Sequence, residues 1–109
     1  QGRRTLDAWY NILKLGGKME IILPDMAFHI KQWNNANRKT NMNKNGMTDI
    51  EYACTGFWGQ QRGKEGELWD VHKSGYDYAL LCDVLTEYKF NNIARQKSAP
   101  KNLHVICWK

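Results

Sequence analysis

The sharpest polar cluster in the sequence is DVHKSG at residues 70–75, which places Asp70, His72, Lys73 and Ser74 within five positions of one another just before a predicted helix. Side chains at a helix N-terminus can present hydrogen-bond donors and the positive end of the helix dipole to an anion. An imidazole or a carboxylate there can also remove a proton from a substrate. His72 and Asp70 are therefore candidate catalytic residues. A capped turn, in which His72 makes only a structural hydrogen bond, is the alternative interpretation.

A helix near the start of the chain is the first element that must position this cluster. Apolar side chains recur at three- and four-residue spacing and predict an amphipathic helix over residues 6–15: Leu6, Trp9, Tyr10, and Ile12 or Leu13. Thr5 or Asp7 is its expected N-terminal cap. Gly16 and Gly17 follow, and glycine closes a helix because it adopts positive φ without steric cost.

A short strand should follow the glycine turn. Met19–Leu23 is a run rich in Ile and Leu, which predicts a strand covered on both faces, as in a parallel sheet. Pro24 cannot donate to a strand ladder, so the strand should end there. Asp25 is then the expected cap of a second helix that ends near Ala36.

The remaining chain predicts two loops, a helical turn, a helix and two strands. Residues 34–48 and 56–70 are expected loops, separated by a short helical turn that Thr48 or Asp49 caps. The next helix, over residues 76–88, should be capped by Ser74 or Asp77. Its predicted buried stripe is Leu80 or Leu81, Val84, Leu85 and Tyr88. A weak strand from Asn91 and an alternating strand from Leu103 to Trp108 should form a hairpin.

Composition limits the class of protein. The 109 residues suffice for one small α/β domain, and their apolar runs are too short to cross a bilayer. The three cysteines are odd in number and widely spaced, which favours a reducing, cytoplasmic location and argues against a disulfide framework or a metal site. The net charge of +5 favours anionic partners such as sugar phosphates or nucleotides. Nucleic acid is an unlikely partner because the basic residues are scattered.

Three segments carry a resemblance to a known family. WYNILKLGGKMEIILPDM at residues 9–26, GFWGQQ followed by DVHKSGYDYALLCDVLTEYKFNNI, and the final LHVICWK occur in that order. Together they resemble the C-terminal half of class I S-adenosylmethionine-dependent methyltransferases, in the branch that carries the HKSG motif. The family's first half, with its Gly-rich cofactor loop, has no counterpart in these residues. Because the chain starts close to its first helix, we expect either a truncated reading frame or an artificial start of the sequence. The resemblance implies a single partial methyltransferase-like domain over residues 1–109.

The resemblance implies a fold and a set of site residues. The fold would be the C-terminal part of a Rossmann-like domain: a three-stranded mixed sheet, with one parallel-type strand and an antiparallel hairpin, packed with about three helices. The last strand would lie between the other two, antiparallel to them. Substrate contacts would come from Pro24, Asp25, Lys73, Ser74 and Tyr76, with His72 or Asp70 as the base. S-adenosylmethionine would be the cofactor, although the isolated chain should bind it weakly or not at all and be inactive.

Two functions follow as expectations. The chain is either the substrate-side portion of a methyltransferase acting on a small molecule or glycan, or a non-catalytic binding or assembly module of the same descent for an anionic ligand. In either case the first strand would leave a bare edge with the apolar sequence IILP, because the neighbouring strand of the resembled fold is missing. Bare edges pair readily with other strands, so we expect a homodimer.

Overall fold

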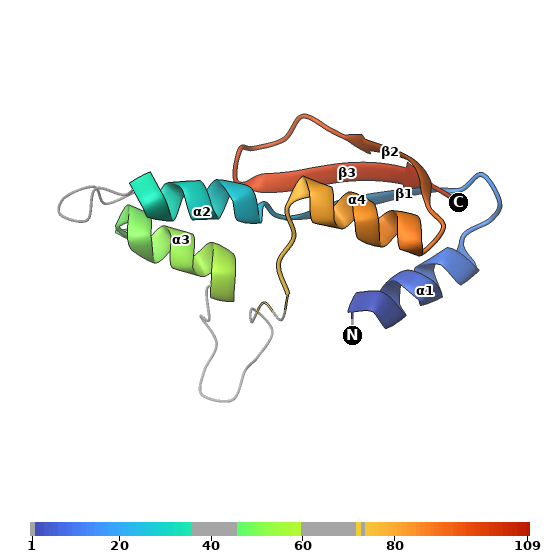
Figure 1. Ribbon diagram of the computed structural model, residues 1–109, viewed down its shortest axis with the longest axis horizontal. Helices are drawn as coiled ribbons and strands as arrows, with labels where there is room; N and C mark the ends of the chain where they lie inside the picture. Colours follow the sequence, from blue (N-terminus) through green and yellow to red (C-terminus); the bar gives the residue numbers. More distant parts are fainter. Residues whose placement is uncertain (1, 36–45, 60–71, 73) are drawn as a thin grey trace. The chain divides into compact units, whose positions relative to one another are not determined.

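The computed structural model of the chain describes residues 2–35, 46–59, 72 and 74–109 (Figure 1). Its elements in chain order are α1 (Gly2–Ile12), β1 (Lys18–Pro24), α2 (Met26–Asn35), α3 (Asp49–Trp58), α4 (Tyr78–Glu87), β2 (Asn91–Arg95) and β3 (Asn102–Trp108). They fall into two compact units. Unit 1 comprises Gln1–Leu23 with Tyr76–Lys109, and unit 2 comprises Pro24–Gly75. No described helix combines the length and apolar character that a membrane span requires.

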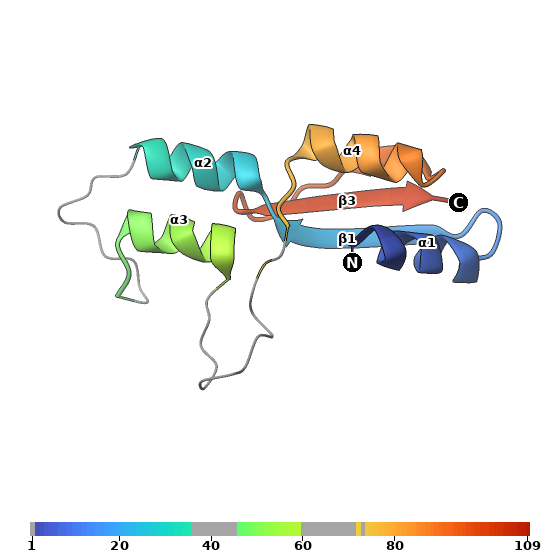
Figure 2. The same cartoon turned by 60° about the horizontal axis from the view of Figure 1, so that its bottom comes forward.

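The sheet of unit 1 has the strand order β1-β3-β2, which places the closing strand between the other two (Figure 2). This confirms the predicted α/β class and the predicted central strand. β2 pairs with β3 in antiparallel register, with Ala94 opposite Ile106 and Arg95 opposite Val105. The predicted antiparallel orientation of the last strand to both of its neighbours is also confirmed, so the described sheet has no parallel pair and only the description of it as mixed was wrong.

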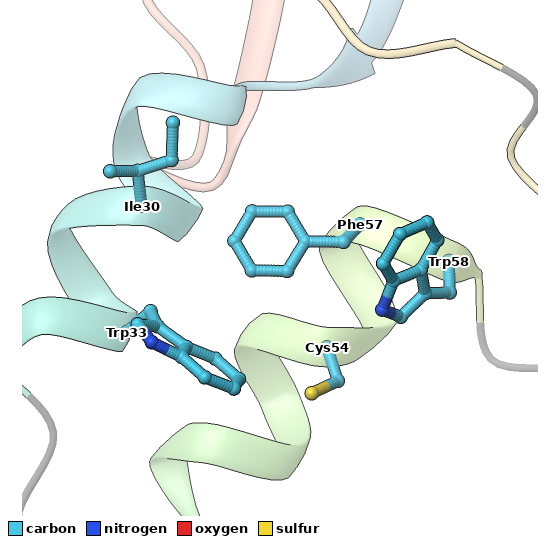
Figure 3. A pocket seen from close by; sticks show the side chains of 5 residues that line it. All are labelled: Ile30, Trp33, Cys54, Phe57 and Trp58. Carbon is cyan, nitrogen blue, oxygen red and sulfur yellow. The ribbon is translucent and has the colours of Figure 1, made fainter.

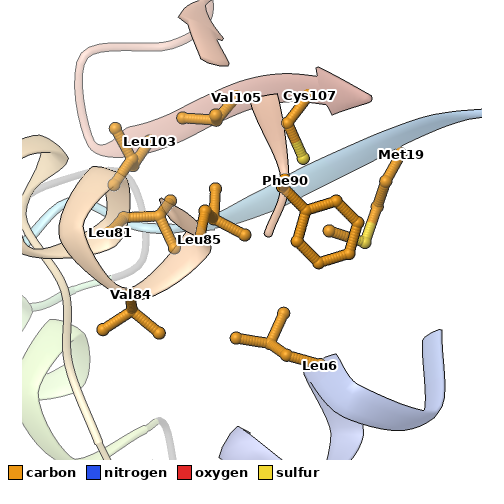
Figure 4. Close-up of a cluster of buried hydrophobic side chains, with 9 residues drawn as sticks. All are labelled: Leu6, Met19, Leu81, Val84, Leu85, Phe90, Leu103, Val105 and Cys107. Carbon is orange, nitrogen blue, oxygen red and sulfur yellow. The ribbon is translucent and has the colours of Figure 1, made fainter. Parts of the chain in front are cut away.

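The core of unit 1 lies on one face of this sheet (Figure 4). Leu103, Val105 and Cys107 alternate along β3 and are fully buried, as the period of two predicts. Leu6 of α1 and three residues of α4 pack against that face: Leu81, Val84 and Leu85. Burial raises the pKa of the Cys107 thiol to about 11. The thiol therefore stays protonated at neutral pH and behaves as a small apolar side chain.

β1 differs from its prediction. Coverage on both faces was expected, but only Met19 is buried along it, and Ile22 is 60% exposed. The reason is topological: among the described elements of unit 1, both helices contribute to the core on one face, as is common for antiparallel sheets. Across the strands, His104 Nε2 lies 2.6 Å from Glu20 Oε1 and ties β3 to β1.

The glycine turn and the chain's last lysine hold α1 against the sheet. Gly16 has φ of 74°, and its N–H donates to the Lys109 carbonyl at 3.0 Å, while Lys109 N–H donates back to the Gly17 carbonyl at 3.0 Å. The Lys109 ammonium donates to the carbonyls of Tyr10 at 2.7 Å and Leu13 at 2.9 Å, just where α1 ends. A cation at a helix C-terminus interacts favourably with the helix dipole.

The predicted caps are partly right. Asp25 Oδ1 accepts from Ala27 N–H, Thr48 and Glu51 form a reciprocal capping box on α3, and Asp77 Oδ1 accepts from Leu80 N–H on α4. The hydrogen bonds from Thr48 hold the pKa of Glu51 below its usual value. Thr5 and Asp7 were wrong as caps, because α1 begins at Gly2 and contains both residues.

Two boundaries also differ from prediction. A short helical turn was expected after Thr48, but the structure has a ten-residue helix there, α3. Because α3 includes Gly56–Trp58, the prediction that a loop begins at residue 56 was wrong. Likewise α2 extends through Asn34 and Asn35 into the loop predicted over residues 34–48. Most of both predicted loops lies outside the described residues.

Adjacent leucines on α4 provide a test of this packing. Leu81 is 2% exposed in the core and Leu80 is 47% exposed. We expect Leu81→Ala to lower the free energy of unfolding by about 2–5 kcal/mol, because it leaves a cavity. The measurement is urea unfolding followed by circular dichroism. Leu80→Ala is the matched control and should cost less than about 1 kcal/mol; equal losses in both variants would contradict the assigned helix face.

Candidate functional site

α2 and α3 lie side by side and make up the described framework of unit 2 (Figures 1 and 2). Gly56 of α3 lies directly against His29 of α2. A Cβ atom added to Gly56 would lie 2.2 Å from His29 Cγ, far inside contact distance, so only glycine fits there. His29 itself is 3% exposed and packs edge-to-face with aromatic rings, including those of Phe28 and Tyr52.

An apolar pocket of about 280 Å³ opens between these two helices (Figure 3). Its lining residues are Ile30 and Trp33 from α2, and Cys54, Phe57 and Trp58 from α3. Phe57 lies between the two indoles in the close-up. Its ring centroid is 6.1 Å from that of Trp33 and 6.5 Å from that of Trp58, with interplanar angles of 61° and 65°. Three inclined aromatic rings therefore share one small cavity.

His72 is hydrogen-bonded to the last turn of α3, the turn that carries Phe57 and Trp58. Its Nδ1 lies 2.9 Å from the Gly56 carbonyl oxygen, and its backbone N–H donates to the Trp58 carbonyl at 3.3 Å. A carbonyl oxygen can only accept, so Nδ1 must carry the proton in this contact. In the neutral ring this leaves Nε2 as the basic nitrogen, which is the tautomer that a general base requires.

Two predicted site segments meet in unit 2. The position of Gly75 lies against Met26, because a Cβ there would be 2.7 Å from the Met26 side chain, and Met26 directly follows Pro24 and Asp25. The end of the HKSG motif thus lies beside the start of α2. Asp25 is 3% exposed and caps α2, with its Oδ1 3.0 Å from Ala27 N, so a structural role accounts for its burial.

The other predicted site residues are more scattered. Ser74 is exposed and does not cap α4, a role that Asp77 takes. Tyr76 is half-buried and belongs to unit 1, where its hydroxyl would lie 3.3 Å from a Cβ on Gly2. Asp70 and Lys73 lie outside the described residues. The described residues contain no group of three or more His, Cys, Asp or Glu that could hold a metal ion.

The aromatic pocket was not predicted from the sequence. Trp33 falls within the predicted second helix, to which no site was assigned, and Phe57 falls within the loop predicted over residues 56–70. A signal was present, since Ile30 and Trp33 are three residues apart and Cys54, Phe57 and Trp58 follow helical spacing. That spacing is also the ordinary signature of a buried helix face, so it did not distinguish a pocket from a core.

Comparisons of the chain with protein-family models, with curated proteins and with solved structures found no match. The resemblance to methyltransferases therefore rests on the quoted sequence segments alone.

The contact between Gly56 and His29 can be tested by a double-mutant cycle. In an exposed helix Gly→Ala stabilises by about 1 kcal/mol, but here we expect Gly56→Ala to destabilise unit 2, because the new methyl group overlaps the imidazole. In a His29→Ala background the same substitution should be neutral or stabilising. Thermal unfolding of the four proteins measures the coupling, and purely additive effects would rule out the close approach.

Proposed function

We propose that this chain is the substrate-side portion of an S-adenosylmethionine-dependent methyltransferase with a Rossmann-like fold, and that it works with a Gly-rich cofactor-binding half that residues 1–109 do not contain. The observation that carries the proposal is the strand order β1-β3-β2. It is the order that the resemblance implies for the C-terminal end of that fold. The proposal is further supported by the meeting of the HKSG segment with the start of α2, at the end of β1.

The residues present do not fit the cofactor by themselves. The sequence has neither a GxGxxG nor a GxxxxGK[ST] loop, and the described residues that line the unit 2 pocket include no carboxylate for a ribose. We therefore derive no step through the cofactor. What this chain would supply is alignment of the acceptor and removal of its proton.

His72 is the residue best placed for proton removal. The Gly56 carbonyl accepts from Nδ1 and holds the ring, so Nε2 is presented in basic form to an acceptor hydroxyl or amine. The backbone hydrogen bond to Trp58 fixes the residue against α3. Positioning of this kind acts mainly through proximity, because an aligned nucleophile reacts without the entropic cost of finding its partner. Asp70 remains the second candidate for this role by its place in the motif.

The test supplies a Gly-rich cofactor-binding half of the same methyltransferase branch as a separate chain and follows transfer of the labelled methyl group of S-adenosylmethionine to sugar phosphates and nucleotides. With both halves present we expect methyl transfer, and we expect it to fall about 10²–10⁴-fold in His72→Asn, because asparagine keeps a donor at the Nδ1 position but lacks Nε2. Calorimetric binding of the donor to the combined halves should be unchanged in this variant. No transfer with both halves present, together with binding of an anionic glycan by this chain, would contradict the proposal.

A second candidate function is a non-catalytic assembly module of the same descent. It is favoured by β1, which ends the described sheet with Ile22 60% exposed. Such an edge can pair with the same edge of a second copy, giving a symmetric dimer. The net charge of +5 would still attract an anionic ligand to this module.

This assembly can be tested by light scattering after size exclusion. We expect the mass of two chains at micromolar concentration, and the mass of one chain for Ile22→Lys, because a lysine on an edge strand opposes pairing. Ile12→Lys on α1, where the isoleucine is 79% exposed, is the matched control and should remain dimeric. A single-chain mass for the unmodified protein would exclude this interface.

A further inference from the structure

The aromatic pocket of unit 2 has a lining that the proposed methyl transfer does not use. Trp58 is 61% exposed, Ile30 is 51% exposed and Trp33 is 37% exposed, although all three are large and apolar. All five lining side chains lack a formal charge at neutral pH. Its volume of about 280 Å³ is near the lower end of the range for small-ligand sites. These features suit a compact ligand whose contacting surface is apolar.

The ring geometry restricts the shape of that ligand. A flat aromatic molecule stacks best between two nearly parallel rings. Here the Phe57 plane is inclined by 61° to one indole and by 65° to the other, so a flat ligand could stack on only one wall at a time. A compact, roughly spherical group can contact several inclined rings together. In the close-up, Phe57 lies between Trp33 and Trp58, and Cys54 lies beside them on α3 (Figure 3).

The local electrostatics select the charge of the ligand. Aromatic rings carry negative potential on their faces, and three such rings meet at this pocket. Cys54, Phe57 and Trp58 also lie in the last turns of α3, at the negative end of its dipole. Lysine and arginine are missing from the lining residues that the structure describes, so no positive side chain among these residues opposes a cation.

The charge of the whole chain does not contradict a cationic ligand. Residues 24–75 contain seven basic and six acidic side chains, so unit 2 is nearly neutral and most of the +5 charge belongs to the residues of unit 1. A cation approaching unit 2 therefore meets little net repulsion from this part of the chain.

We propose that the pocket formed by Trp33, Phe57, Trp58, Cys54 and Ile30 binds a trimethylammonium group. The methyl groups of this ion match the apolar lining, and its diffuse positive charge interacts with the ring faces. A compact ammonium such as that of lysine is more strongly hydrated and loses more on entering an apolar site. The proposal stands on the pocket alone and is independent of methyl transfer and of His72.

The decisive experiment compares choline with its neutral isostere, in which a tert-butyl group replaces trimethylammonium. The two ligands have nearly the same shape, so only the charge differs. We expect choline to bind the unmodified chain about tenfold more tightly, as a cation–π contribution of about 1.4 kcal/mol predicts. The readout is the shift of the indole N–H signals of Trp33 and Trp58 in a nitrogen-15 correlation spectrum. Equal or tighter binding of the isostere would overturn the proposal, since it would show an apolar pocket without preference for a cation.

Variants locate the site. Trp33→Leu and Trp58→Leu keep an apolar side chain but remove a ring, and each should weaken choline binding about tenfold. Trp9→Leu is the matched control, because Trp9 is 42% exposed on α1 in unit 1, and it should leave the affinity unchanged. An equal loss in Trp9→Leu would refute the location. If a pocket variant fails to fold, the comparison of choline with its isostere on the unmodified chain still decides the question.

Two sources can present the same chemical group. Free choline represents a small metabolite, and a peptide that carries trimethyllysine represents a protein partner. Tighter binding of one identifies the source, while either result supports the site if the neutral isostere is rejected. Tighter binding of indole than of both cations would contradict the proposal, because it would mean that a flat ligand fits the inclined rings better.

Discussion

One face of β3 has to be kept out of water, and the arrangement of unit 1 follows from that constraint. Leu103, Val105 and Cys107 are each fully buried, although they come from the middle strand of a sheet only three strands wide. A strand can reach such burial only if both its edges are paired and its apolar face is covered. β1 and β2 provide the pairing, and α4 with Leu6 of α1 provides the cover.

Unit 2 depends on a different contact, the fit of the His29 ring against Gly56. The separation of two packed helices depends on the size of the side chains at their contact. Here α2 and α3, of ten residues each, are in contact where Gly56 leaves room for the imidazole of His29. The same crossing has a consequence for chemistry, because the carbonyl of Gly56 accepts the hydrogen bond from His72 Nδ1. Gly56 therefore serves both contacts: it allows α3 to pack against His29 of α2, and its carbonyl orients the imidazole of His72.

Charge has to be considered locally in this protein. The overall excess of basic residues favours anionic partners, yet the described lining of the aromatic pocket in unit 2 has no charged residue and includes three aromatic rings. The first statement concerns the whole chain, and the second concerns five lining residues. A net charge describes long-range attraction in solution, whereas ring faces and helix ends act over a few ångströms, where a bound group is in contact.

The sequence by itself determined the elements whose signals are local. The alternation of residues 103–108 predicted β3, and the glycine pair predicted the turn before β1. Asp25 was recognised as a cap, and the structure chose Thr48 over Asp49 and Asp77 over Ser74 from the two predicted pairs; a cap is recognisable because it is a contact within three residues. The HKSG motif identified His72, but the sequence left open whether its role is structural or catalytic.

Only the tertiary structure decided what depends on residues far apart in the chain. It exposed Ile22 and Leu80 and buried Leu81, since the covered face is fixed by which elements pack there. It assigned the proton to Nδ1 of His72 through a carbonyl sixteen residues away. It also made a pocket of Trp33, Phe57 and Trp58, whose spacing alone was equally consistent with a buried core. Helical periodicity reports which residues share a face, whereas a pocket arises from how two such faces meet.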